Sequence, residues 1–307
     1  MKGTNMKISK RAISAIGTIL MLTSFVFIMR RIMQYDIDFS FSPIMWMWLL
    51  LIALAIACGL IFAAFNFRWL LGNLSALYLE PRLTIKTYCI ANLYKYLPGS
   101  VMYVLGRNRL ALEITGLTHV RVAGATVLEG MFIALAATAI SGLFIYNYFI
   151  YFANQIGPII WAAIGLLTLI LAIGAIFFRK RLTAGLVAFR EGAKGFNFKA
   201  MARLMGSCVL IMLVLGSSFV ALLIILGQPI AWHQVTTLIG LYVLSWLMGF
   251  ITPGAPGGLG VREAVILMVM GGVMYEGLLV YAVITHRILT IIGDVFAYCI
   301  ALAYSKI

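Results

Sequence analysis

The stretch Phe250-Ile251-Thr252-Pro253-Gly254-Ala255-Pro256-Gly257-Gly258-Leu259-Gly260-Val261-Arg262-Glu263 interrupts a long apolar region of the chain. Its two prolines lack an N–H donor, and each of its four glycines costs a helix about 1 kcal/mol relative to alanine. Inside a membrane, interrupted backbone is tolerated only where protein or a water-filled cavity surrounds it. We therefore expect this stretch to line a cavity. A helix that restarts at Val261 would direct its free N–H groups into that cavity beside Arg262, as a site for an anion.

A weaker copy of this pattern lies in the first half of the chain, where Tyr96-Leu97-Pro98-Gly99-Ser100 is followed by Gly106-Arg107. In both places an arginine stands nine residues after the proline of a Pro-Gly pair. Pro-Gly is also a common turn. The matching positions in the two halves, rather than either copy alone, therefore indicate a repeated site.

The composition is that of an integral membrane protein. Of the 307 residues, 64% are hydrophobic and 10% are charged, with a mean hydropathy of +1.07. Several apolar runs reach about 18 residues, enough to cross a bilayer core roughly 30 Å thick. The net charge of +14 lies mostly between these runs, as the positive-inside rule requires, and does not indicate nucleic-acid binding. The four cysteines are scattered and Walker, GxGxxG, CxxC and HExxH motifs are absent, so we expect neither a metal nor a cofactor.

These runs predict an all-α, polytopic membrane bundle that forms a single membrane domain over residues 1–307. The predicted full spans are Ala12–Met29, Ile44–Phe65, Val122–Tyr146, Pro158–Phe178, Met205–Leu226 and Leu278–Tyr304. Because the first run has a basic start but no cleavage site, we interpret it as a retained span. Two further pairs of segments, Ile85–Leu97 with Val101–Leu112 and Val235–Ile251 with Val261–Gly272, predict re-entrant hairpins with their tips at the Pro-Gly pairs. For the first pair, a pair of amphipathic helices on the cytoplasmic surface is an alternative.

The order span, span, hairpin, span occurs over residues 12–146 and again over residues 158–304. Three crossings in each half give the two halves opposite orientations, and inverted repeats with broken helices at the midplane are a transporter design. The basic N-terminus and the basic segments Arg68–Lys86, Arg107–Arg121 and Arg179–Arg203 predict the cytoplasmic side. We therefore expect a multi-pass protein of the cell inner (cytoplasmic) membrane with both termini in the cytoplasm.

Charged groups within a membrane are rare unless they are paired or functional. The residues predicted to bind a lipid headgroup or its phosphate are Lys95, Pro98, Gly99, Ser100, Arg107, Gly257, Gly258, Gly260, Arg262 and Glu263. A second set, Glu129, Arg287 and Asp294, is predicted to balance charge or couple movement to protons. Ion pairing between helices explains the second set equally well. Arg107 is alternatively ordinary cytoplasmic charge, and Glu263 alternatively complements the dipole of its own helix.

The element Pro253-Gly254-Ala255-Pro256-Gly257-Gly258-Leu259-Gly260-Val261-Arg262-Glu263, with the Tyr96–Ser100 and Gly106-Arg107 elements, resembles the membrane region of the lysylphosphatidylglycerol synthase family, also called the flippase-like domain family. The resemblance covers nearly the whole chain. It implies a flippase-like protein of the bacterial or archaeal cell envelope, with Arg262 and Glu263 at the headgroup site. Its expected partners are membrane lipids, either an anionic phospholipid or a polyprenyl-phosphate-linked glycolipid. The full synthases add a soluble aminoacyl-transfer domain that this sequence lacks, so we expect no lipid aminoacylation by this chain.

Three hypotheses follow, of which a flippase without enzymatic activity is the expected one. A non-catalytic membrane partner of a synthase or glycosyltransferase would dock that enzyme through the basic segment Arg179–Arg203. An integral-membrane transferase using a lipid-phosphate sugar donor would need Glu263 or Glu129 as a base. The absence of a sizeable loop for a second substrate disfavours the transferase.

Overall fold

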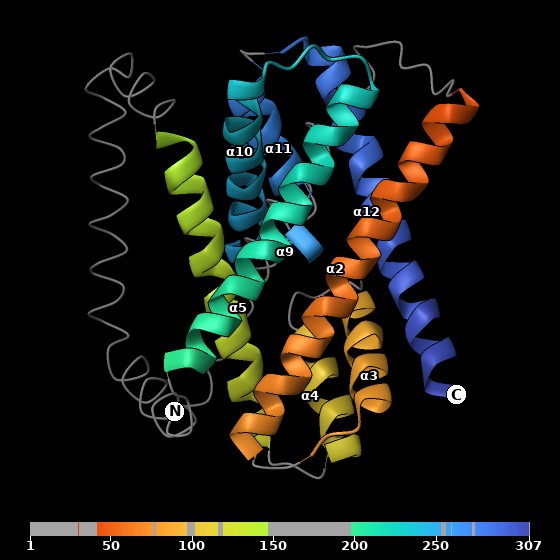
Figure 1. Ribbon diagram of the computed structural model, residues 1–307, viewed down its shortest axis with the longest axis vertical. Helices are drawn as coiled ribbons and strands as arrows, with labels where there is room; N and C mark the ends of the chain where they lie inside the picture. Colours follow the sequence, from red (N-terminus) through yellow and green to blue (C-terminus); the bar gives the residue numbers. More distant parts are fainter. Residues whose placement is uncertain are drawn as a thin grey trace, which may run out of the picture.

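The computed structural model of the protein describes Arg30 and residues 42–75, 78–96, 102–115, 119–146, 198–252, 256–258, 260–271 and 274–306 (Figure 1). Every regular element in these ranges is a helix. Five of the helices are long and apolar enough to cross a membrane: α2 (Pro43–Ser75), α5 (His119–Phe144), α9 (Phe198–Ile225), α10 (Trp232–Ile251) and α12 (Glu276–Lys306). The shorter elements are α3 (Pro81–Leu93), the 3-10 turn η1 (Tyr94–Tyr96), α4 (Met102–Thr115), the 3-10 turn η3 (Pro256–Gly258) and α11 (Val261–Met270). The predicted class, an all-helical multi-pass membrane protein, is confirmed.

Four of the predicted spans correspond to α2, α5, α9 and α12. The predicted spans Ala12–Met29 and Pro158–Phe178 lie outside the described residues. Helix α10, predicted as one limb of a hairpin, begins at Trp232, three residues earlier than expected. Its 20 residues extend about 30 Å, so by length alone it also qualifies as a span.

Helix α2 differs most from its predicted bounds, because it continues past Phe65 to Ser75. The polar residues after Phe65 predicted an end there, but the next proline is Pro81, so nothing in the backbone forces one. The guanidinium of Arg68 is accommodated locally. Its Nε donates to the carbonyl oxygen of Leu79 at 2.7 Å, and its central carbon lies 5.4 Å from the Tyr78 ring centre. With 33 residues, α2 is about 50 Å long, well beyond a bilayer core.

Two helix pairs point toward each other from opposite ends of the bundle. Helices α3 and α4 occupy its lower half, and α10 and α11 occupy its upper half (Figure 1). The turns η1 and η3, at the inner ends of these pairs, contact each other. Each pair stands between two long helices in the chain order, α2 and α5 for the first pair and α9 and α12 for the second. Corresponding long helices of the two groups run in opposite directions in Figure 1.

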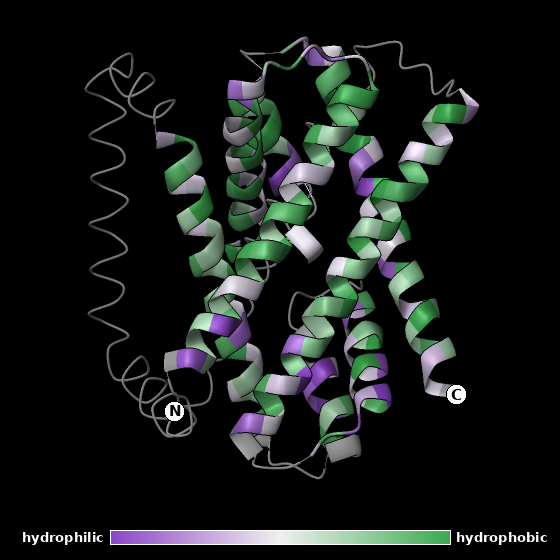
Figure 2. Cartoon of the chain, viewed as in Figure 1, coloured by the Kyte–Doolittle hydropathy of each residue, from purple (hydrophilic) through white to green (hydrophobic). Residues whose placement is uncertain are grey.

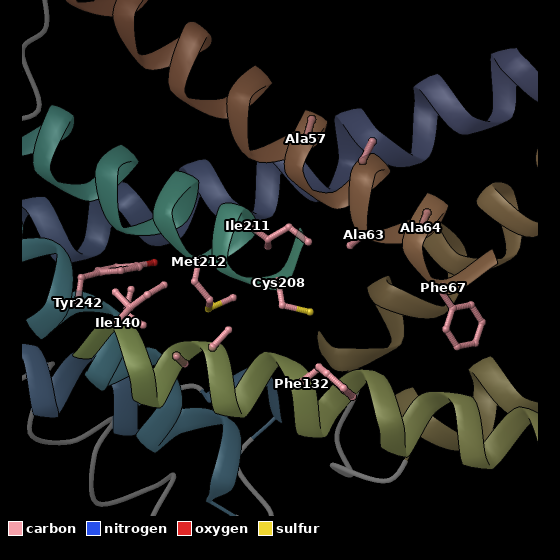
Figure 3. Packing of buried hydrophobic residues seen from close by; sticks show 14 of the residues in the cluster. Ala57, Ala63, Ala64, Phe67, Phe132, Ile140, Cys208, Ile211, Met212 and Tyr242 are labelled. Carbon is pink, nitrogen blue, oxygen red and sulfur yellow. The ribbon is translucent and has the colours of Figure 1, made fainter. Parts of the chain in front are cut away.

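Small residues bring the long helices close together. A Cβ on Gly216 of α9 would lie 2.7 Å from Cγ2 of Ile239 in α10, and a Cβ on Gly293 of α12 would lie 2.9 Å from the carbonyl oxygen of Ala53 in α2. Such positions allow close helix packing in membranes. Figure 3 shows part of the core, with Ala57 and Ala63 on α2, Phe132 on α5 and Ile211 on α9. Hydrophobic residues also cover most of the length of the long helices (Figure 2), as contact with lipid requires.

Candidate functional site

A cavity of about 630 Å³ lies where the two turns meet. Its wall includes Lys95 and Tyr96 of η1, Gly257 and Gly258 of η3, and residues of α2, α3, α5, α9, α10, α11 and α12. Its ionisable lining residues, tyrosines aside, are Lys95, Glu129, Arg262, Arg287 and Asp294. The volume lies within the range of roughly 300–1,000 Å³ that is typical of ligand sites. The fold thus brings together charged residues that are up to about two hundred positions apart in the sequence.

The second turn is held in conformations that favour glycine. The φ angles of Gly257, Gly258 and Gly260 are 58°, 71° and 84°, in the left-handed region where a Cβ is unfavourable. Gly258 also packs on α10, because a Cβ at this position would lie 3.1 Å from Cα of Gly249. These three glycines, all predicted site residues, shape the backbone between α10 and α11.

Helix α11 begins at Val261, as the sequence predicted. The Oε2 atom of Glu263 accepts a hydrogen bond from the backbone N–H of Gly260 at 2.7 Å. Glu263 therefore satisfies one of the unpaired donors at the start of its own helix and places a negative charge at the positive end of the helix dipole. This is the alternative role that the sequence left open for Glu263.

Arg107 lies behind the cavity wall and is fully buried. Its guanidinium makes an ion pair with Glu129, which does line the cavity. The Tyr88 hydroxyl donates to the other oxygen of Glu129 at 2.8 Å, and the Tyr88 ring centre lies 4.1 Å from the central guanidinium carbon of Arg107. These contacts connect α4 to α3 and α5 directly behind the cavity wall, since Tyr88 and Glu129 both line the cavity.

Asp294 of α12 accepts donors from the first helix pair. Its Oδ2 atom lies 2.6 Å from Nζ of Lys95 and accepts a hydrogen bond from the hydroxyl of Tyr96. The side-chain amide of Asn92 donates to its Oδ1 atom at 2.9 Å. Asp294 is buried, whereas 30% of the Lys95 side chain is exposed. This cluster fastens the first turn to α12.

Arg287 of α12 makes the corresponding contacts to the second turn. One terminal nitrogen donates to the carbonyl oxygen of Gly257 at 3.1 Å, and its Nε lies 3.7 Å from Oε1 of Glu263. Arg287 and Asp294 stand seven residues apart, which places them on one face of the helix. One face of α12 therefore holds both turns.

Arg262 differs from the other cationic residues of the site. It lines the cavity, yet it forms no ion pair with any carboxylate in the described ranges. Its Nε atom is buried and has no hydrogen-bond partner among the described residues. Its guanidinium carbon lies 5.6 Å from the ring centre of Trp246, which stacks on Phe250 at 5.1 Å. Among the described residues, Arg262 is therefore the cavity-lining cation that has no anionic partner.

The charge balance around the cavity follows from these pairs. Each of the three carboxylates, Glu129, Glu263 and Asp294, lies within ion-pair distance of its own cation. Four cations stand against them: Lys95, Arg107, Arg262 and Arg287. The undescribed residues of the two turns, 97–101, 253–255 and 259, have no ionisable side chain. The described charges and the turns together thus have a surplus of one positive charge.

The sequence-predicted site is partly assembled in one place. Lys95, Glu129, Gly257, Gly258, Arg262, Arg287 and Asp294 line the cavity, while Gly260, Glu263 and Arg107 support its wall. Pro98, Gly99 and Ser100 lie outside the described residues. Sequence reasoning did not assign the uncharged partners Tyr88, Asn92, Tyr96 and Trp246. Asn92 gave the clearest signal, as an amide in an apolar helix, and the tyrosines and the tryptophan gave none beyond a common preference for membrane interfaces.

The geometry defines a class: a polytopic helical membrane protein with a charged central cavity bounded by two interrupted helix pairs. No group of histidine, cysteine, aspartate and glutamate side chains in the described part of the chain is arranged to hold a metal ion. No protein-family model matches the chain, and no curated protein sequence matches it significantly. The resemblance to the flippase-like domain family stays a prediction based on the Pro-Gly elements.

Proposed function

We propose that the protein is a flippase-like lipid transporter that receives an anionic headgroup in the central cavity while the apolar chains stay in the bilayer. The observation that carries this proposal is Arg262, a cavity-lining cation without a carboxylate partner in the described ranges. A guanidinium binds phosphate through charge-assisted hydrogen bonds, and those bonds are strong where water is scarce. In cell-envelope biogenesis such a headgroup belongs to an anionic phospholipid or a polyprenyl-phosphate-linked glycolipid.

The proposed membrane placement makes both helix pairs re-entrant hairpins. Helices α3, α4 and α11 have 13, 14 and 10 residues and extend about 20, 21 and 15 Å, too short for a bilayer core of about 30 Å. Their turns meet at mid-height in Figure 1. An inverted repeat with broken helices at the midplane places a transported substrate at the breaks.

Lipid, rather than a small soluble anion, is favoured by the apolar part of the wall. Val127, Met131 and Phe250 line the cavity and are 55%, 43% and 45% exposed. A lipid can therefore keep its chains against these residues while its headgroup reaches Arg262. Lys95, with its partly exposed side chain, is the second donor in this proposal, because its ammonium has three N–H donors and can contact the phosphate while it stays beside Asp294.

Asp294 is the residue that we assign to proton coupling. Its carboxylate is buried in the cavity wall beside Lys95, where the negative charge of a bound headgroup comes close to it. The transferase alternative gains no support from the same side chains, because Glu129 and Glu263, its candidate bases, each contact an arginine.

A reconstituted flipping assay tests the proposal. Proteoliposomes containing fluorescently labelled phosphatidylglycerol would be compared for wild type, Arg262→Gln, Arg262→Lys and the control Arg82→Gln, which removes a half-buried cation beside Tyr304 that does not line the cavity. Loss of one charged hydrogen-bonding group costs about 1.5–3 kcal/mol, so we expect Arg262→Gln to slow flipping by roughly 10–100-fold. Arg262→Lys should retain part of the rate, and Arg82→Gln should retain all of it.

Two results would contradict the proposal at different points. Wild-type rates for Arg262→Gln would show that the assigned headgroup site is wrong. Wild-type liposomes that flip anionic lipid no faster than protein-free liposomes would remove the transport function itself.

A further inference from the structure

Among the described residues, the cations around the cavity outnumber the carboxylates by one, and their arrangement limits how much negative charge a ligand can bring. Lys95 lies 2.6 Å from Asp294, Arg107 is paired with Glu129, and Arg287 lies 3.7 Å from Glu263. Only Arg262, among the described charges of the site, stands outside these pairs. A ligand with one negative charge neutralises the site without disturbing any pair.

A second negative charge on the ligand would meet a different environment. Glu129 and Asp294 face the same cavity and would repel it. Recruiting Lys95 or Arg287 to that charge would remove the cation from Asp294 or Glu263, which are 4% and 6% exposed. Leaving a buried carboxylate without its partner is costly. The cavity therefore favours a single charge over two.

We infer that the cavity selects phosphodiester headgroups, which carry one negative charge, over phosphomonoesters and diphosphates. This inference rests on the proposed function and names the substrate class of the same site. A phosphodiester has one ionisable oxygen, whereas a phosphomonoester has a second pKa of about 6 and is a dianion at pH 8. Phospholipids of the phosphatidylglycerol type and lipids with a sugar on a single bridging phosphate meet the requirement. Lipids with a diphosphate bridge do not.

We call this preference for one negative charge over two the charge rule. Equilibrium binding to the purified full chain in detergent at pH 8 tests it. Dioleoyl phosphatidylglycerol and dioleoyl phosphatidic acid have the same chains and differ in phosphate charge, and glycerophosphoglycerol is the headgroup of the first without its chains. Displacement of a fluorescent phosphatidylglycerol gives the three dissociation constants. We expect phosphatidylglycerol to bind at least about tenfold more tightly than phosphatidic acid, the ratio that about 1.4 kcal/mol produces. Glycerophosphoglycerol should bind more weakly than either lipid.

Two variants should reverse this preference. Asp294→Asn releases Lys95 and Glu263→Gln releases Arg287, and both released cations line the cavity. Each variant raises the surplus from one positive charge to two, so phosphatidic acid should bind at least as tightly as phosphatidylglycerol. Glu80→Gln makes the same chemical change at an exposed residue before α3 and should leave the ratio at its wild-type value. Using two independent variants keeps the test decisive if one of them does not fold.

The outcomes separate this inference from the proposed function. If wild type binds phosphatidic acid as tightly as phosphatidylglycerol, or if a folded Asp294→Asn or Glu263→Gln protein keeps the wild-type ratio, the charge rule is wrong while anionic-lipid transport stands. If glycerophosphoglycerol binds as tightly as the lipid, the charge rule stands and the lipid function falls. If no anionic probe binds better than dioleoyl phosphatidylcholine, the anion site is wrong, and with it both conclusions.

Discussion

At Gly258, both the backbone conformation and the close packing of the neighbouring helix favour a residue without a Cβ. Its φ angle of 71° favours glycine, and a Cβ would lie 3.1–3.2 Å from backbone atoms of Gly249. The neighbouring backbone cannot move away as the end of a flexible side chain can. Gly227, after α9, has a similar φ of 87° but has open space where its Cβ would be. Comparing substitutions at the two glycines therefore distinguishes the cost of backbone strain from the cost of lost packing space.

We predict that Gly258→Ala destabilises the protein more than Gly227→Ala does. A left-handed conformation costs an L-residue about 1–2 kcal/mol, and Gly258→Ala adds the contact with Gly249. Thermal unfolding in detergent would measure both variants. Equal losses of stability would show that the close packing of the second turn on α10 is not as described. Flipping or lipid binding should fall in Gly258→Ala and stay near wild type in Gly227→Ala.

Arg107 and Arg262 occupy the same position after their Pro-Gly pairs, but their surroundings differ. Arg107 is enclosed by Phe67, Tyr88 and Glu129, whereas Arg262 faces the cavity beside Trp246. The sequence predicted that both arginines follow the turns, because each stands nine residues after the proline of its Pro-Gly pair. It could not assign the partners, which come from helices distant in the chain.

We predict that Arg107 contributes to stability through its pair with Glu129. Arg107→Met should lower the free energy of unfolding by about 3–5 kcal/mol because it leaves a buried carboxylate without its cation. The double variant Arg107→Met with Glu129→Leu should recover much of this loss, and a thermodynamic cycle from unfolding measurements would give the coupling. An Arg107→Met protein with wild-type stability and no lipid binding would instead support direct phosphate contact by Arg107.

At the scale of elements, the interruptions were more predictable than the helix lengths. The restart of α11 at Val261 follows from proline and glycine chemistry, which is local. In the extension of α2 to Ser75, by contrast, Arg68 is accommodated by contacts with Leu79 and Tyr78. Those residues lie outside the helix, so its own sequence does not reveal the contacts. The role of α12 likewise depends on three-dimensional contacts. The seven-residue spacing of Arg287 and Asp294 predicted that they share one face of the helix, but not that this face binds the two turns.

We predict that Tyr96→Phe loosens the first turn from α12. The tyrosine hydroxyl donates to the carboxylate of Asp294, and hydrogen bonds to charged groups contribute about 1.5–3 kcal/mol. Tyr78→Phe, at a side chain that is 84% exposed, is the matched control. Thermal unfolding should show a loss of stability for Tyr96→Phe alone. Identical curves for the two variants would mean that this hydrogen bond does not fasten the turn.

At the scale of the whole molecule, hydropathy was sufficient to predict the class and most of the long helices. It was not sufficient to predict the pairing of the helices or the position of the cavity, because interior packing depends on residue shape as well as on polarity. In the described ranges, Arg68, Arg82, Lys86, Lys199 and Arg203 lie at the end of the bundle where α2 ends and α3 begins. The positive-inside rule predicts that this end faces the cytoplasm.

We predict that the two ends of the bundle react from opposite sides of the membrane. In a variant without the four native cysteines, Glu80→Cys should react with a membrane-impermeant maleimide only after permeabilisation. His233→Cys, an exposed position at the start of α10, should react in intact spheroplasts. The reverse pattern would invert the proposed orientation. Labelling of both positions from one side would contradict the opposed entry of the two helix pairs.

The attachment of both turns to α12 has a mechanical consequence. Asp294 holds one turn and Arg287 the other, on a helix that is unbroken from Glu276 to Lys306. An unbroken helix that holds two turns seven residues apart moves as one piece, so a displacement of one turn is passed to the other. In the proposed transporter, such linkage would make the two turns move together around a bound headgroup.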